Sequence, residues 1–140
     1  MDTHLLRRFL ASRVARLATV SEDGRPHVVP ITFAADAETI VFAIDHKPKA
    51  TARVKRLENI SANSAVSVLA DHYDEVWDRL WWVRADGRAK VIESGHPDHT
   101  PALDRLVAKY PQYRTRRPEG AAVLITIDRW SGWRASAAGT

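Results

Sequence analysis

Five cations gather in one short stretch of this 140-residue chain: Lys47, Lys49, Arg53, Lys55 and Arg56. No acidic residue lies among residues 47–56, and the whole chain has a net charge of only +4. The rest of the sequence is therefore close to neutral, which favours one focused anion site over a generally basic surface. Cations near the start of a helix can hold a phosphate or a carboxylate through charge-assisted hydrogen bonds. The alternative is a solvated cationic helix face.

A second candidate site is the β-rich run Val28, Val29, Pro30 and Ile31, which follows a turn at Asp23 and Gly24. A proline inside such a run predicts an edge strand or a bulge, because it cannot donate to a strand ladder. Backbone groups beside Pro30 would then be free to bond a flat heterocyclic ligand. The alternative is an ordinary edge strand.

Other chemistries find little support in the sequence. The chain has no cysteine, which excludes a disulfide scaffold, a cysteine nucleophile and a thiolate zinc site. It has no GxSxG, P-loop or GxGxxG motif. His96 and His99 have a metal-like spacing, but the glycine and prolines around them predict a turn and a helix start, so we expect no metal. Arg114, Arg116 and Arg117 either reach a ligand site or lie in a solvated loop.

The elements that must position these residues follow from the apolar periodicity. We expect a helix around Leu5–Leu10, a helix that carries the basic residues and ends at Asn59–Asn63, and a helix at Pro101–Tyr110. The expected strands are Ala15–Val20, Val28–Ala34, Ile40–Ile44, Ala65–Ala70, Leu80–Arg84, Arg88–Glu93 and Ala121–Ile127, with a hairpin turn at Asp86-Gly87.

Short strands joined by tight turns predict a mainly β (α+β) fold, a small antiparallel barrel with helices over its openings. The length predicts a single domain over residues 1–140. No apolar run approaches the ~20 residues of a membrane span, and residues 1–9 show no signal-peptide core, so we expect a cytoplasmic protein without a membrane partner.

An ordered set of motifs resembles the split β-barrel flavoproteins of the pyridoxamine 5'-phosphate oxidase-like superfamily. Within it, the actinobacterial branch of deazaflavin (coenzyme F420)-dependent enzymes is the most similar. The motifs lie at residues 17–20, 23–30, 44–49, 56–63, 80–84, 86–89 and 130–134, and so extend over nearly the whole chain.

The resemblance implies a six-stranded antiparallel split β-barrel with flanking helices, and a homodimer with cofactor sites at its interface. It places Val28, Val29, Pro30 and Ile31 against the cofactor ring. It also places a cation at the cofactor phosphate, a position that Arg56 takes, with Ile60 and Asn63 completing the family pattern and Lys55 at the neighbouring basic position. Val54 replaces the serine of the family pattern.

The function that the resemblance implies is hydride transfer between coenzyme F420, or alternatively FMN, and a small conjugated organic substrate. Residues 47–53 would then contact the longer anionic tail of the deazaflavin. The substrate-phosphate motif of the vitamin B6 oxidases is missing from residues 130–140, so that reaction is not expected. A carrier or sensor of the same fold, holding FMN, F420 or haem without turnover, is the alternative. Nucleic-acid binding is not expected, because the basic run has no recognition motif or stacking aromatics beside it.

Overall fold

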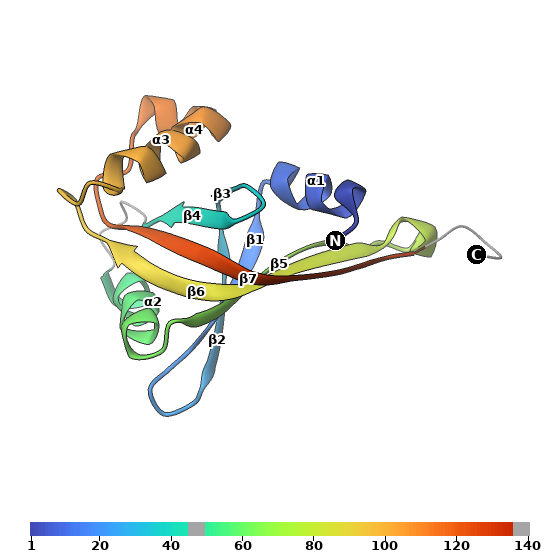
Figure 1. Cartoon of the computed structure of the whole chain (residues 1–140), viewed down its shortest axis with the longest axis horizontal. Helices are drawn as coiled ribbons and strands as arrows, with labels where there is room; N and C mark the ends of the chain where they lie inside the picture. The colour runs from blue at the N-terminus through green and yellow to red at the C-terminus, as the bar shows by residue number, and fades with distance from the viewer. Residues whose placement is uncertain (45–49, 136–140) are drawn as a thin grey trace.

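The computed structural model describes residues 1–44 and 50–135, with the side chains of residues 50–54 excepted. Its helices are α1 (Thr3–Ala11), α2 (Ala50–Ala62), α3 (His99–Lys109) and α4 (Pro111–Thr115), with a short 3₁₀ turn at Trp77–Arg79. Its strands are β1 (Ala15–Val20), β2 (Pro26–Ile31), β3 (Ala34–Ala35), β4 (Thr39–Ala43), β5 (Ala65–His72), β6 (Trp81–Ile92) and β7 (Ala122–Arg134). All are shown in Figure 1.

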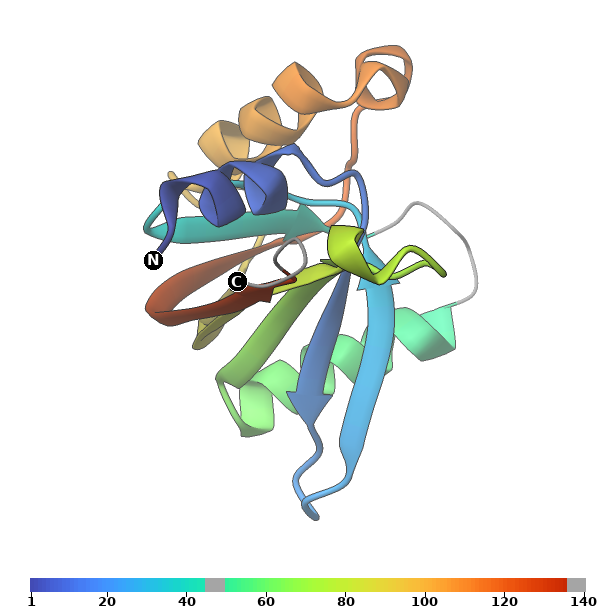
Figure 2. The same cartoon turned by 90° about the vertical axis from the view of Figure 1, so that its right-hand side faces the viewer.

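The strands form one antiparallel sheet in the order β2-β1-β5-β6-β7-β4-β3. The sheet curves strongly, with α2 near its lower end and α1, α3 and α4 near its upper end in the view of Figure 2. This arrangement confirms the predicted α+β split barrel. The sheet has seven strands rather than six, because the expected run Val28–Ala34 divides into β2 and the two-residue β3.

Two hydrophobic clusters hold these layers together. The inner cluster fills the curve of the sheet and is closed by Leu5 and Phe9 of α1 and by Ile60 of α2. The outer cluster lies under α3 and includes Leu106. Strand β4 serves both, since its consecutive residues 40–42 are all buried on its two faces. Burial on both faces explains why this strand is a continuous apolar run rather than an alternating one.

The predicted hairpin at Asp86-Gly87 is wrong, because β6 continues through both residues as one strand of 12 residues. The register shifts there: Asp86 pairs with Arg129, whereas Gly87 pairs with Ile127. A Cβ atom on Gly87 would overlap the carbonyl oxygen of Thr126. The glycine therefore serves a close approach of two strands at a bulge, not a turn.

The basic helix ends within the predicted range Asn59–Asn63, since α2 continues through Asn59 to Ala62. The side chain of Asn59 is buried, and its Nδ2 donates to Thr19 Oγ1 of β1 at 3.0 Å. Because this amide bonds to the sheet, it does not compete with the helix backbone as an exposed asparagine would. The helix ends just before Asn63, whose Oδ1 accepts from the N–H of Ala65.

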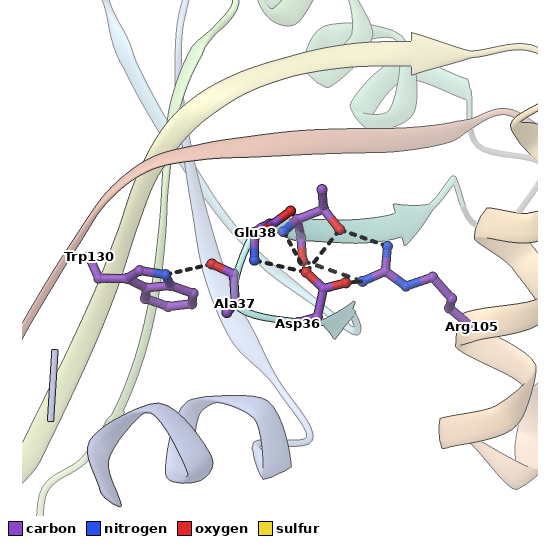
Figure 3. A network of polar contacts seen from close by, with 6 residues as sticks. Asp36, Ala37, Glu38, Arg105 and Trp130 are labelled. Carbon is purple, nitrogen blue, oxygen red and sulfur yellow. Dashed lines mark hydrogen bonds and ion pairs between the residues drawn. The ribbon is translucent and has the colours of Figure 1, made fainter. Parts of the chain in front are cut away.

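A polar network ties α3 and β7 to the turn between β3 and β4 (Figure 3). Arg105 of α3 donates to Thr39 Oγ1 at 2.9 Å and lies 3.5 Å from the carboxylate of Asp36. From the other side, Trp130 Nε1 donates to the carbonyl oxygen of Ala37 at 2.9 Å. The network fixes α3, and therefore α4 behind it, relative to the sheet.

Among the described helices, none is both long enough and apolar enough to cross a bilayer.

Candidate functional site

The predicted site residues lie on two elements, β2 and the region of α2. Lys47, Lys49 and the side chain of Arg53 lie outside the described residues. The description of the basic segment therefore rests on Lys55 and Arg56, and the assignment of all five cations to a ligand stays a prediction.

Strand β2 alternates, as a strand at the edge of a curved sheet must. Val28 and Pro30 are exposed, whereas Val29 is partly buried and Ile31 belongs to the inner cluster. Only two of the four residues predicted to line a flat ligand therefore present side chains outward. Their role in binding a cofactor stays a prediction.

The backbone of β2 offers a second kind of contact. Strand β2 is a terminal strand of the sheet, which confirms the edge position predicted from Pro30. The N–H of Ser21 donates to the carbonyl of Arg25 at 2.9 Å. In an antiparallel ladder bonded pairs alternate from there, so His27, Val29 and Ile31 bond toward β1. The N–H and C=O of Val28 and the C=O of Pro30 then turn to the outer edge.

The edge of β2 and the basic helix meet at one hollow, of about 310 Å³. We call it the β2–α2 hollow, and its lining residues are Val14, Pro30, Ile31, Thr32, Ala43, Arg56 and Tyr113. Arg56 is half-buried and is the only charged residue in this lining, which is drawn from the described residues. A guanidinium withdrawn from bulk water interacts more strongly with an anion than an exposed one does. This hollow therefore joins a cationic group to the predicted ligand strand.

Lys55 faces a different hollow, although it is the neighbour of Arg56 in the chain. This turn hollow of about 1040 Å³ is lined by Ser21, Glu22, Asp23, Lys55, Leu57, Glu58, Asn59, Ser61 and Ala62. Consecutive helical residues point about 100° apart, which separates the two cations. Three carboxylates against one ammonium make the turn hollow a poor site for a phosphate. Lys55 and Arg56 therefore line different hollows.

The carboxylate of Asp23 shows how local bonds dominate in the turn hollow. The hydroxyl of Ser21 donates to Asp23 Oδ1 and is the main cause of a lowered Asp23 pKa, against an opposing effect of burial. The charge of Lys55 lowers the same pKa further, but by less than the hydrogen bonds to this carboxylate do. Lys55 is therefore an exposed cation that interacts with a nearby acid.

A third hollow, which the sequence did not indicate, lies beside the β2–α2 hollow. It has a volume of about 540 Å³, and we call it the α4 hollow. Its lining residues are Arg13, Val14, Thr32, Tyr110, Pro111, Gln112 and Tyr113. The sequence predicts Tyr110 as the last residue of a helix, and in the structure this residue is buried directly after α3. In the sequence, the only indication of this hollow is the close spacing of aromatic residues and a proline at residues 110–113. Nothing in the sequence indicates that Arg13 or Thr32 lies close to these residues.

The arginines after α3 are used by the fold. Arg114 donates to the carbonyls of Val107 and Ala108 near the end of α3. Arg117 donates to Asp104 Oδ1 at 2.8 Å. These two guanidiniums therefore contact α3, and a ligand contact by Arg114, Arg116 or Arg117 stays a prediction.

Comparisons with known proteins agree with this architecture. The model of the family described as pyridoxamine 5'-phosphate oxidase matches residues 1–134. A FAD-binding protein from Mesorhizobium loti is similar with a TM-score of 0.72 and 22% identity, over 97% of this chain and 96% of that one. The FAD binding protein from Mycobacterium smegmatis gives 0.64 and 19%, over 98% of both chains. HupZ from Group A Streptococcus gives 0.66 and 19%, also over 98% of both chains. At these identities the structures show a shared fold. A comparison with curated proteins finds no match.

Proposed function

Because the chain belongs to the pyridoxamine 5'-phosphate oxidase family, we propose that it is an oxidoreductase that binds a flavin-type cofactor in the β2–α2 hollow. The observation that carries the proposal is the juxtaposition of Arg56 with the outward edge of β2. Arg56 would bind the cofactor phosphate, and the edge backbone at Val28 and Pro30 would bond the heteroatoms of the ring. The similarity to two FAD-binding proteins supports a cofactor of the flavin type.

The side chains of the β2–α2 hollow would bind and orient rather than react. Besides Arg56, its polar side chains are the hydroxyls of Thr32 and Tyr113, and the described lining holds no carboxylate or histidine. When bound, the cofactor would supply the hydride chemistry itself. The protein's part would be to hold the ring against β2 and exclude water from it.

For the cofactor we propose coenzyme F420, with FMN as the alternative. The support is the basic run of the sequence: before Arg56 it supplies Lys47, Lys49 and Arg53, more cations than a single phosphate needs. A deazaflavin with a long anionic tail would use them. The proposed reaction is hydride transfer to a small conjugated organic acceptor.

We further propose that the protein acts as a homodimer with its cofactor sites at the interface. A hollow of about 310 Å³ is at the low end of the ~300–1,000 Å³ that encloses ligands, so one chain covers only part of a three-ring cofactor. Val28, beside the hollow, is 62% exposed, and Val14 in its lining is 44% exposed. A second copy would cover this apolar surface.

The test is a fluorescence titration of the purified protein with coenzyme F420 and, separately, with FMN, alongside a light-scattering mass. We expect saturable binding of F420 by a dimer. Binding of FMN alone would overturn the choice of cofactor and keep the family function. Tight binding without oxidation of reduced F420 by a panel of enones and quinones would favour the carrier or sensor. Binding of neither cofactor would reject the proposal.

A further inference from the structure

The α4 hollow adjoins the β2–α2 hollow, and the two share the three residues Val14, Thr32 and Tyr113. We propose that the α4 hollow binds the electron-accepting substrate, a planar aromatic or conjugated ketone that carries a carboxylate. The inference rests on the proposed function, which places the cofactor on the other side of the shared residues. A molecule in the α4 hollow would then be the neighbour of the cofactor ring.

The lining of the α4 hollow matches a flat molecule with two polar ends. The rings of Tyr110 and Tyr113 lie 5.6 Å apart in an edge-to-face arrangement, next to Pro111. Arg13 is the only charged residue among the described lining residues, and so this hollow, unlike the turn hollow, contains no carboxylate to repel an acid. Arg13 uses one N–H to bond the carbonyl of Lys109 at 2.9 Å. A guanidinium has five such donors, so others remain for a ligand carboxylate.

The second polar end is the hydroxyl pair of Thr32 and Tyr113, which are 2.7 Å apart with either oxygen able to donate. If Thr32 donates to Tyr113, the Tyr113 O–H is free to donate to a ketone oxygen. Addition of a hydride from the reduced cofactor to the carbonyl carbon would break the C=O π bond and leave a negative charge on this oxygen. The hydrogen bond would stabilise that charge until a proton from solvent completes the alcohol. Tyr113 lines both hollows, so its hydroxyl is placed where the acceptor meets the cofactor.

The wall that carries these groups is well fixed. The Tyr110 hydroxyl accepts from the N–H of Phe33 at 3.0 Å and lies 2.8 Å from the carbonyl of Arg13. Lys109 Nζ donates to the carbonyl of Ser12 at 2.7 Å. The end of α3 is thus bonded to the segment between α1 and β1 in both directions. A preorganised wall reduces the ordering that binding requires.

The experiment uses 4-acetylbenzoate as the probe, added to the purified protein with and without saturating F420 or FMN. Binding is measured from the backbone amide shifts in NMR spectra. We expect shifts at residues 13 and 110–113, and an affinity that falls about tenfold in Arg13→Gln, equivalent to ~1.4 kcal/mol. Acetophenone, which lacks the carboxylate, should bind the two proteins equally. Arg7→Gln, the same change on the exposed part of α1, is the matched control.

The other polar end is tested in the same way. Tyr113→Phe should weaken 4-acetylbenzoate about fivefold and leave benzoate, which has no ketone, unchanged. Arg13→Lys, which keeps the charge, should restore part of the affinity and guards against a folding defect in Arg13→Gln. In Arg13→Gln the affinity for F420 or FMN should stay within about twofold, because Arg13 does not line the β2–α2 hollow.

Two results would overturn the inference, and they are distinguishable. If cofactor binds but 4-acetylbenzoate gives no saturable shifts, or equal affinity in Arg13→Gln, the α4 hollow is not the acceptor site and the proposed function stands. If 4-acetylbenzoate binds through Arg13 but neither cofactor binds, the hollow takes an aromatic acid without a redox partner, and the acceptor role fails together with the proposed function.

Discussion

The turn hollow and the β2–α2 hollow both lie beside α2, and each is lined by one of two cations that are neighbours in the chain. The other residues that line the two hollows differ. In the turn hollow, exposed Lys55 lies among Glu22, Asp23 and Glu58. In the β2–α2 hollow, half-buried Arg56 lies among apolar residues and two hydroxyls. In the turn hollow, nearby acids partly neutralise the charge of Lys55. In the β2–α2 hollow, the described lining around the charge of Arg56 contains no carboxylate. A cationic run in a sequence therefore locates a helix, and the fold decides which of its cations form a site.

The largest effect on this comparison is expected from a substitution of Arg56. Arg56→Ala should weaken the binding of F420 or FMN by about 1.5–3 kcal/mol, because it removes a charge-assisted hydrogen bond. The measurement is a fluorescence titration, with circular dichroism to show that the fold is kept. An unchanged affinity would place the phosphate elsewhere on the protein.

The next effect concerns how α2 is held between the two hollows. Asn59→Ala should lower the free energy of unfolding by about 1–2 kcal/mol, since it leaves the buried Thr19 hydroxyl without its partner. Urea denaturation measures the change, and Ser61→Ala on the exposed side of α2 is the control. Thr19→Val combined with Asn59→Ala should cost less than the sum of the two single changes. Full additivity would contradict the coupling.

Lys109 tests the effect of burial on a third cation, near the α4 hollow. Burial, and then the charge of Arg13, lower the pKa of Lys109 to about 8 from its ordinary 10.5. Between these values the unfolded chain holds a proton that the folded chain has released, so this group makes stability rise with pH from about 8 toward 10.5. Urea denaturation from about pH 7 to about pH 10 should show a smaller rise in Lys109→Met than in Lys90→Met. Lys90 is exposed. Equal rises would show that Lys109 is not desolvated.

The smallest effect is expected at Lys55. Lys55→Ala should change cofactor affinity by less than about twofold, because an exposed cation surrounded by acids contributes little. The second measurement on Lys55→Ala is the pKa of Asp23, which the Ser21 hydrogen bond lowers most and the Lys55 ammonium lowers least. An NMR titration of this variant should therefore show only a slight rise in the Asp23 pKa. A loss of affinity as large as that of Arg56→Ala would mean that both cations bind one anion after all.

Much of the fold was predictable, because alternation and apolar periodicity are local properties. The edge position of β2, for example, followed from Pro30. The error at Gly87 has a physical origin: an Asp-Gly pair suits a turn, yet here the glycine lacks a side chain so that Thr126 can approach. Nothing in the local sequence distinguishes these two uses of glycine.

By itself the sequence determined most of the strands and three of the helices, the resemblance to a split barrel and the position of the basic run. Only the tertiary structure decided that Arg56 lines the same hollow as Pro30, while Lys55 lines the same hollow as Asp23. It also decided that Arg13 lines one hollow with Tyr113, about a hundred residues further along the chain. The reason is that side-chain direction on a helix is local, whereas the surface opposite it depends on how the sheet curves and which strands pair. Charge and shape at a site arise from that packing.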